Sequence, residues 1–351
     1  MSILIVGGGI AGIAIHFRLR QAGIDAHMMD QALEGNSSRA AAGIINPLTG
    51  SNFAKSWNFD YLLPELFSFY EDVSQLLGVN VLKKLDFNRY LNSLSQVNAW
   101  LMKTTLSDYE PYCGQADPIS VEKNKKNLYK VKVENAYHVN MMTLIDGYHS
   151  LLRKEGLFTE GIIAYDQVFP DGEVVRISKD VWDQVIFCEG WRVNNNPFFN
   201  YLPVIPNWGQ ALVLKNRDSI VDRADRFKNL LCYQTPEHCW YGATMRPVEG
   251  LPADFNSYPQ SLEDDFIQDY DQAPEILDIK SGLRPTVRDR KPIIGRHPAH
   301  PRLMCFNGLG TKGASLAPWL SGLLPGYLSE SAILPAEVDI RRFDHLWSKI
   351  H

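Results

Sequence analysis

The 351-residue sequence lacks any run of about eighteen consecutive apolar residues, and its first residues form neither a basic segment nor a signal cleavage site. These absences argue against a transmembrane helix and a secretory leader. The five cysteines are odd in number and have no close paired spacing, which fits reduced thiols better than a disulfide framework. We therefore expect a cytoplasmic protein without a membrane span.

Positive charge is also scarce. The chain has 35 Lys and Arg against 40 Asp and Glu, so its formal net charge of -5 argues against nucleic acid or an anionic membrane as partner. Cys232 and Cys239, with His238 between them, lack the fourth ligand and the tight spacing of a zinc site. The sequence shows no Ser-His-Asp or Cys-His constellation that would favour hydrolysis. We expect no metal.

The composition that remains is that of a folded globular protein. Hydrophobic residues make up 45% and charged residues 21% of the chain, and no long segment is biased enough to suggest disorder. The length corresponds to about two domains, or to one large domain with an insertion. Either could bury a sizeable core.

A βαβ unit opens the chain. Residues 2–6 form a short apolar run typical of a buried parallel strand, a helical pattern follows as far as Gly23, and residues 26–29 form a second apolar run that ends in Asp30. Between the first strand and the helix stand three glycines in G-x-G-x-x-G spacing, Gly7, Gly9 and Gly12. Because strand, glycines, helix, second strand and acid occur in this order, we predict a dinucleotide site.

Each feature of this unit has a physical task. The first glycine permits the tight turn, the second admits a pyrophosphate to the backbone, and the third lets helix and strand pack closely. The phosphate charge then meets the helix N-terminus, and Asp30 accepts hydrogen bonds from ribose hydroxyls while repelling a 2′-phosphate. The cofactor-binding residues expected here are Gly7, Gly9, Ile10, Ala11, Gly12, Asp30 and Gln31. The motif does not separate FAD from NAD.

A second small-residue stretch, SSRAAAGIINPLTG, covers residues 37–50. Small side chains let a backbone lie close to a flat ligand, and serine hydroxyls can donate hydrogen bonds to its oxygens. A serine-rich loop before a strand would show the same pattern. If the stretch binds the cofactor, the residues involved are Ser37, Ser38, Arg39, Ala42 and Gly43.

Taken with GLRPTVRDRKPIIG at 282–295 and GLGTKGASLAPWLSGLL at 308–324, these motifs resemble the glycine oxidase and D-amino acid oxidase family of flavoproteins. VIFCEGW at 185–191 resembles the strand of that family that ends beside the cofactor, although Glu189 stands where a small residue is usual. The resemblance spans nearly the whole chain and implies FAD. It adds the cofactor-binding candidates Gly190, Gly310, Thr311, Lys312 and Gly313.

Within this family, two patterns look closest to the flavin oxidase domain of the bacterial bifunctional enzyme that completes 5-methylaminomethyl-2-thiouridine in tRNA. They are R-D-x-x-P-I-I-G at 288–295 and T-K-G-x-x-x-A-P at 311–318. That enzyme also carries a methyltransferase domain, for which this chain has no room.

Arg284 is the candidate substrate clamp. Leu283 and Pro285 predict an extended backbone around it, and residues 292–295 predict a strand that returns to the cofactor domain. A surface arginine paired with Asp289 is the alternative. The resemblance implies that Arg284 holds the substrate carboxylate, as a planar guanidinium can through two parallel, charge-assisted hydrogen bonds.

The resemblance also implies the reaction, which is hydride transfer from the carbon bearing the amine to flavin N5, followed by hydrolysis of the imine. Oxygen or another acceptor would take up the electrons. The N–H groups of 310–313 and the Lys312 ammonium would face the negative charge of the reduced ring. Arg284, Tyr241 and Lys312 are the catalytic candidates. Tyr241, Trp208 and Asn46 are the candidates to line the substrate side, although aromatic residues on strands are more often core.

The expected fold is α/β, with a Rossmann-like FAD-binding domain of the p-hydroxybenzoate hydroxylase and D-amino acid oxidase type and a second domain built on an antiparallel sheet. Residues 1–85, 138–200 and 285–351 would form the FAD-binding domain, and residues 86–137 and 201–284 the substrate domain. No motif predicts an oligomeric state.

The favoured function is FAD-dependent oxidation of a small amino acid or secondary amine carboxylate. Three alternatives stay open: a flavin oxidase acting on a carboxymethylaminomethyl-type tRNA base, a flavin-binding protein without redox turnover, and an NAD dehydrogenase. The last would leave the carboxy-terminal segment without a purpose. A hydroxy acid is a further substrate class, because Arg284 would hold either kind of carboxylate.

Overall fold

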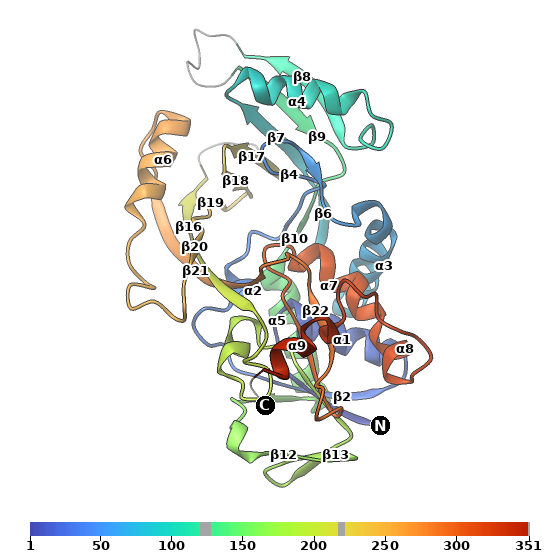
Figure 1. Cartoon of the computed structure of the whole chain (residues 1–351). Coiled ribbons are helices and arrows are strands. Elements are labelled where there is room, and N and C mark those ends of the chain that lie inside the picture. The colour runs from blue at the N-terminus through green and yellow to red at the C-terminus, as the bar shows by residue number, and fades with distance from the viewer. Residues whose placement is uncertain (120–127, 217–221, 350–351) are drawn as a thin grey trace.

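The structure is a computed structural model that describes residues 1–119, 128–216 and 222–349. Two large sheets organise the chain, and Figure 1 shows them in different halves of the molecule, with both termini beside the lower one. The mixed α/β architecture predicted from the sequence is confirmed. No helix in these ranges is both long and apolar enough to cross a bilayer.

The first sheet has six strands in the order β11-β2-β1-β15-β23-β22, and neighbours are parallel except β22 and β23. Its strands are β1 (Ser2–Val6), β2 (Asp25–Asp30), β11 (Phe158–Glu160), β15 (Gln184–Phe187), β22 (Ile293–Arg296) and β23 (Leu303–Asn307). α1 (Ile10–Gln21) connects β1 to β2, so the predicted βαβ unit is confirmed.

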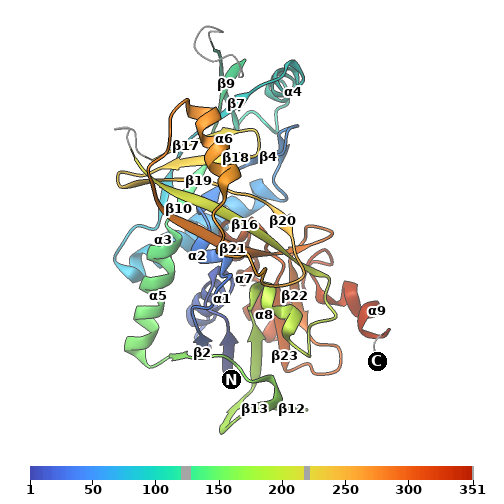
Figure 2. The same cartoon turned by 90° about the vertical axis from the view of Figure 1, so that its left-hand side faces the viewer.

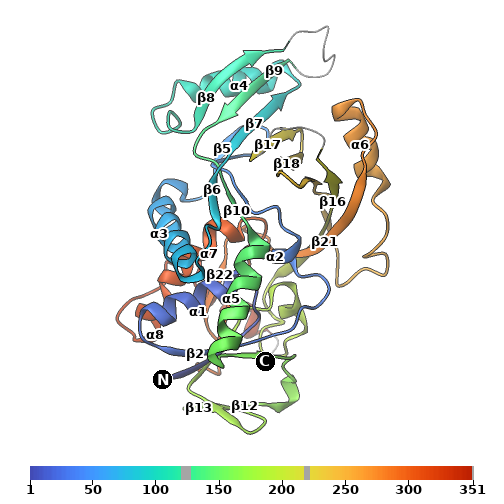
Figure 3. The same ribbon diagram turned by 180° about the vertical axis from the view of Figure 1, so that it is seen from behind.

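Both faces of this sheet are covered, which explains why its strands read as unbroken apolar runs. Ile3 and Ile5 of β1 point into one core, and Leu4 points into the other. The first core lies under α1, α3 (Phe59–Leu77), α5 (Met141–Glu155), α7 (Gly313–Gly322) and α8 (Leu324–Leu328). Figure 3 shows α5 and α3 in front of this part of the molecule. The second core lies against the small sheet of β12 (Val168–Asp171), β13 (Val174–Ile177) and β14 (Asp180–Trp182).

The second sheet has nine strands, in the order β20-β16-β19-β18-β17-β7-β9-β8 with β21 beside β16. All neighbours are antiparallel except β17 and β7. The strands are β7 (Asp86–Leu91), β8 (Cys113–Pro118), β9 (Tyr129–Val133), β16 (Val204–Lys215), β17 (Arg223–Phe227), β18 (Leu230–Gln234), β19 (His238–Gly242), β20 (Arg246–Pro247) and β21 (Ile276–Val287).

The two faces of the nine-stranded sheet have different surroundings. Tyr241 and Leu212 point toward α6 (Gln260–Tyr270), which Figure 2 shows lying over the sheet. We call the opposite side the inner face. There the Trp240 Nε1–H donates to the Ala40 carbonyl, and a Cβ built on Gly282 would lie 3.0 Å from the Ala40 Cβ. The inner face therefore looks toward α2 (Ser37–Ala40), the small-residue stretch of the cofactor domain.

Short elements complete the chain. A three-stranded sheet, β3-β10-β6, lies between the two large sheets in Figure 3. Its strands are β3 (Ile44–Ile45), β6 (Leu82–Lys84) and β10 (Tyr137–Val139). The other elements are the pair β4 (Leu48–Thr49) and β5 (Ala54–Lys55), the helices α4 (Leu94–Thr104) and α9 (Asp344–Trp347), and the 3-10 helices η1 (Tyr165–Gln167), η2 (Gly190–Asn195) and η3 (Ile340–Phe343).

Candidate functional site

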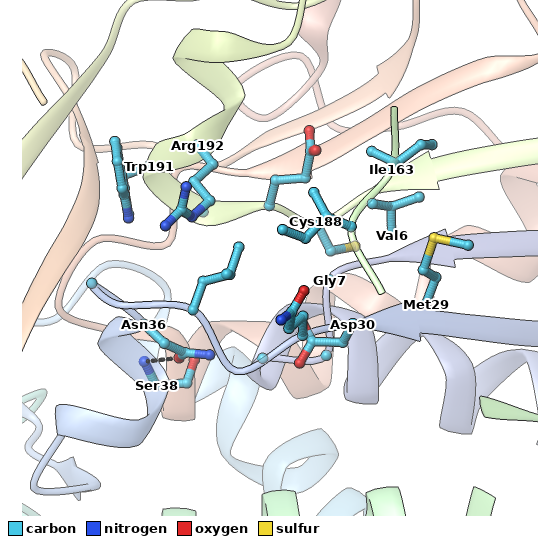
Figure 4. A pocket seen from close by; sticks show the side chains of 18 of the residues that line it. Val6, Gly7, Met29, Asp30, Asn36, Ser38, Ile163, Cys188, Trp191 and Arg192 are labelled. Atoms are coloured by element: carbon cyan, nitrogen blue, oxygen red, sulfur yellow. Dashed lines mark hydrogen bonds between the residues drawn. The ribbon is translucent and has the colours of Figure 1, made fainter. Parts of the chain in front are cut away.

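A cavity of about 260 Å³ opens at the carboxyl ends of β1, β2 and β15. In open α/β sheets this edge is where ligands bind. Figure 4 shows Asp30, Asn36 and Ser38 on one side of the cavity, with Trp191 and Arg192 across from them. Seven of the residues predicted from the sequence line it, namely Gly7, Gly9, Asp30, Gln31, Ser37, Ser38 and Gly190.

The glycines give this cavity its shape. Gly7 has a φ of +106°, and a Cβ there would lie 2.5 Å from the Cys188 carbonyl oxygen. Gly9 is the N-cap of α1 without a side-chain cap, and a Cβ on it would meet only the Ser38 side chain, at 3.0 Å. A helix N-terminus that keeps its N–H donors beside an open space fits a diphosphate.

Other predicted residues of this unit lie around the cavity rather than in its lining. The Ile10 N–H donates to Ser38 Oγ at 3.2 Å, and Ala11 packs against the main core. A Cβ on Gly12 would lie 1.9 Å from the Gly7 carbonyl oxygen, so Gly12 keeps the helix close to the turn.

His149 supports the floor of the cavity, a role that the sequence did not indicate. Its Nε2 lies 2.9 Å from the Gly8 carbonyl oxygen, and a Cβ on Gly8 would lie 2.5 Å from the same nitrogen. Burial raises the pKa of the Asp30 carboxyl, while the Gly8 N–H and His149 oppose that shift. A buried histidine on an amphipathic helix looks like a core residue in the sequence, and only the packing of α5 brings it beneath the glycines.

Glu189 follows β15 and lines the cavity. Its carboxylate accepts hydrogen bonds from the Tyr165 hydroxyl at 2.5 Å and from Asn196 Nδ2 at 2.9 Å. Burial nevertheless raises the pKa of the Glu189 carboxyl to about 7. The acid that departs from the family pattern therefore has dedicated partners that connect β15 to η1 and to the end of η2.

Glu189→Gln should change how stability depends on pH. Because burial raises the Glu189 pKa from 4.5 to about 7, the folded wild type is favoured at pH 4.5 and loses this stability as pH rises to 7. The neutral glutamine should therefore match the wild type at pH 4, below the unfolded pKa, and exceed it at pH 8 by on the order of 1–3 kcal/mol. Urea unfolding at both pH values measures this. A variant less stable than the wild type at pH 8 would contradict the assignment.

The segment that resembles a flavin-lining stretch lies beside this cavity. Asn36 caps α2 by accepting from the Ser38 and Arg39 N–H groups. Arg39 pairs with Asp146 at 2.8 Å, and Ala42 packs against the main core. Gly43 has a φ of +68°, and a Cβ there would lie 2.0 Å from the Val139 carbonyl oxygen. Asn46 accepts from the Leu48 N–H at 3.0 Å and so fixes the turn into β4.

The carboxy-terminal motif meets the amino-terminal one. A Cβ on Gly313 would lie 2.9 Å from Ile10, so the N-termini of α7 and α1 are neighbours. Gly310 has a φ of +55° and donates to the Pro285 carbonyl, and Thr311 and the α7 N-cap Lys312 follow it. Burial lowers the pKa of Lys312, with Arg290 and Lys291 adding to that shift.

Arg284 lies on the inner face of β21. Its guanidinium covers Gly209 of β16, where a Cβ would lie 2.2 Å from Nη1, and Nη1 donates to the Thr244 carbonyl at 3.2 Å. Burial lowers the pKa of Arg284. Within residues 1–119, 128–216 and 222–349 no carboxylate pairs with it, and Asp289, the alternative partner, pairs with Arg342 instead. A partly buried cation without a counter-charge fits an anionic ligand.

Two predicted residues of the substrate side lie elsewhere. Tyr241 is fully buried toward α6 and donates to Asp269 at 2.8 Å, and Trp208 packs against Phe255 and Leu283. The structure therefore does not bring either one to Arg284. Side chains alternate along a strand, so a shift of one residue reverses the face. The neighbouring Trp240 points to the inner face instead, and the sequence could not distinguish it from Tyr241.

The chain was compared with known proteins. A family model for FAD dependent oxidoreductases (DAO) matches residues 2–324. Glycine oxidase of Bacillus subtilis (strain 168) is 25% identical over 359 residues, covering 92% of this chain and 91% of that protein. Glycine oxidase from Geobacillus kaustophilus has a TM-score of 0.76 at 18% identity, with 95% of each chain covered. Iminodiacetate oxidase from Chelativorans sp. BNC1 has a TM-score of 0.76 at 19% identity, covering 97% of this chain and 98% of that one.

Proposed function

Since the chain belongs to the DAO family of FAD dependent oxidoreductases, we propose that it oxidises the C–N bond of a small amino acid or secondary amine that carries a carboxylate. The observation that carries this proposal is Arg284, a cation on the inner face without a carboxylate partner in the described part of the chain. The similarity to glycine oxidase and iminodiacetate oxidase supports the same substrate class.

The residues around the cavity fit FAD. The open space at Gly9 and the N-terminus of α1 would receive the diphosphate, and Asp30 would accept from ribose hydroxyls. Ser38 and the backbone near Gly43 would contact the cofactor where it extends from the cavity toward the inner face. When bound, FAD supplies the acceptor for the two electrons that leave the substrate.

Arg284 would orient the substrate. Two parallel N–H groups of a guanidinium fix a carboxylate in position and direction, which places the neighbouring C–H bond for reaction. The hydrogen bond to the Thr244 carbonyl, and the absence of a side chain at Gly209, let the guanidinium lie close to the sheet. A hydroxy acid would present the same carboxylate, so the amine class rests on the family and not on Arg284 alone.

Lys312→Met should lower the reduction potential of the bound flavin by on the order of 30 mV, which is ~1.4 kcal/mol for two electrons. The ammonium stands at the start of α7 and would stabilise the negative charge of the reduced ring. Potentiometric titration measures the change. Lys154→Met, which removes an exposed lysine from α5, is the control. An unchanged potential in Lys312→Met would remove this residue from the catalytic set.

The division of the chain into domains is part of the proposal. The strands of the six-stranded sheet all come from residues 1–85, 138–200 and 285–351, which supports one FAD-binding domain. Most of the nine-stranded sheet comes from 86–137 and 201–284, which supports one substrate domain, although β21 continues to Val287.

A modified tRNA base is the narrower alternative substrate. It is supported only by the patterns at 288–295 and 311–318, and the net charge of -5 argues against it. Anaerobic titration of the FAD-loaded protein tests both readings by bleaching of the visible flavin band. The compounds are glycine, sarcosine, D-amino acids, 2-hydroxy acids and a carboxymethylaminomethyl nucleoside. Bleaching by an amino acid supports the main proposal, and bleaching by the nucleoside alone supports the alternative. A yellow protein that none of them bleaches would support flavin binding without turnover.

A further inference from the structure

Two arginines face each other across neighbouring strands of the nine-stranded sheet. Arg89 of β7 is directly opposite Arg226 of β17. Opposing residues on adjacent strands project from the same side, and like charges in that arrangement destabilise a sheet. The pair therefore costs stability that another interaction has to offset.

Neither arginine has an acidic partner within the described ranges. Arg89 is 5% exposed, donates to the carbonyls of Leu48 and Gly50, and lies over the Phe53 ring at 4.4 Å. Arg226 is half-buried and donates to the Asn229 carbonyl at 3.4 Å. Burial, and to a smaller extent the neighbouring Arg226, lower the pKa of Arg89 to about 9.

The acid nearest in sequence points the other way. Asp225 precedes Arg226, so its side chain leaves the opposite face of β17, where it pairs with Arg223 at 2.9 Å and accepts from Asn88. Asp222, four residues before Arg226, pairs with Lys83 at 3.5 Å instead. The strand thus supplies carboxylates to other cations and leaves Arg89 and Arg226 without one.

The pair stands on the inner face, the same side as Arg284. One row of paired residues runs across the sheet from Arg89 through Arg226, Leu231, Gly242 and Ala211 to Lys280. Arg284 is four residues beyond Lys280 on β21, so alternation returns it to this face. Gly242 and Ala211 in the middle of the row add no long side chain to the inner face, while Leu231 of the row and the neighbouring Trp240 line it.

We propose that Arg226, backed by Arg89, binds a second anionic group of the substrate, while Arg284 holds the carboxylate next to the amine. Four strand spacings of roughly 4.8 Å separate β17 from β21, and the four residues from Lys280 to Arg284 add about 13 Å along the strand. The second anion therefore sits on an extended substituent, several bonds from the amine, and is a carboxylate or a phosphate. This inference rests on the proposed function and narrows its substrate class to amino acids with a distal acidic group.

The test uses N-(ω-carboxyalkyl)glycines with one to five methylene groups, each paired with its neutral ω-amide. We expect the FAD-loaded wild type to prefer the acid over the matched amide by on the order of 10-fold or more in kcat/KM, with the preference largest at the longer chains. Arg226→Gln should abolish the preference, and Arg226→Lys should keep part of it. Lys228→Gln, which removes an exposed positive charge two residues away, should leave it intact.

Each result decides the proposal. Equal rates for acid and amide at every length, or a preference that survives Arg226→Gln, would overturn it even if simple amino acids are oxidised. N-(2-phosphooxyethyl)glycine carries a phosphate in place of the distal carboxylate. Comparing its kcat/KM with that of the carboxylate compounds shows which of the two anions the site favours.

If no compound is oxidised, the proposed function fails and calorimetry still decides the anion site. N-(5-carboxypentyl)glycine should bind the FAD-loaded wild type more tightly than its amide does, and Arg226→Gln should remove the difference. Equal binding of acid and amide would overturn the inference.

Discussion

Arg284→Met is expected to lower kcat/KM for a carboxylate-bearing amine by on the order of 100-fold or more. A well-made hydrogen bond to a charged group contributes roughly 1.5–3 kcal/mol, and two of them correspond to about 10²- to 10⁴-fold. Because Arg284 has no carboxylate partner among the described residues, its loss leaves no buried protein charge uncompensated. Steady-state kinetics with glycine or sarcosine measures the effect, and the flavin spectrum should stay unchanged.

Three comparisons isolate the role of this arginine. Arg288→Met removes an exposed arginine just beyond β21 and should change kcat/KM less than about 2-fold, as is usual for exposed charges. Arg284→Lys keeps the charge but not the planar fork, so it should recover only part of the loss. Carboxamide analogues should react equally slowly with the wild type and with Arg284→Met. A decrease below about 5-fold with the carboxylate substrate would be inconsistent with a clamp.

Gly9→Val should weaken FAD binding by on the order of 100-fold or more while the protein still folds. A Cβ at Gly9 would meet only Ser38 inside the protein, and the valine would occupy the space where a diphosphate would approach α1. The loss of one or two charge-assisted hydrogen bonds to phosphate accounts for about this factor. Quenching of flavin fluorescence on titration of the apoprotein measures affinity, and circular dichroism reports the fold.

Two other glycines serve as references for that experiment. Gly250→Ala lies in a loop where an added Cβ meets nothing within 4 Å, so affinity should not change. Gly12→Val should lose structure as well as cofactor, because a Cβ at Gly12 would lie 1.9 Å from the Gly7 carbonyl oxygen. A Gly9→Val protein that binds FAD as tightly as the wild type would refute the assignment of the cavity.

The sequence by itself determined the features that depend on neighbours along the chain. The apolar run of β1, the glycines at 7, 9 and 12, the pattern of α1 and Asp30 at the end of β2 are all local, and the βαβ unit forms as expected. The same holds for Arg284, because Pro285 predicts extended backbone and β21 extends through it. Fold class and family also followed from the order of such motifs.

Only the tertiary structure decided which side of a strand each residue uses and what it meets there. Tyr241 and Trp240 are adjacent, yet one packs beneath α6 and the other reaches Ala40. His149 and Gly8 come together only because α5 packs under the first turn. Arg89 and Arg226 are far apart in sequence and meet through the register of β7 and β17. Register and packing depend on the whole set of long-range contacts, which no local pattern contains.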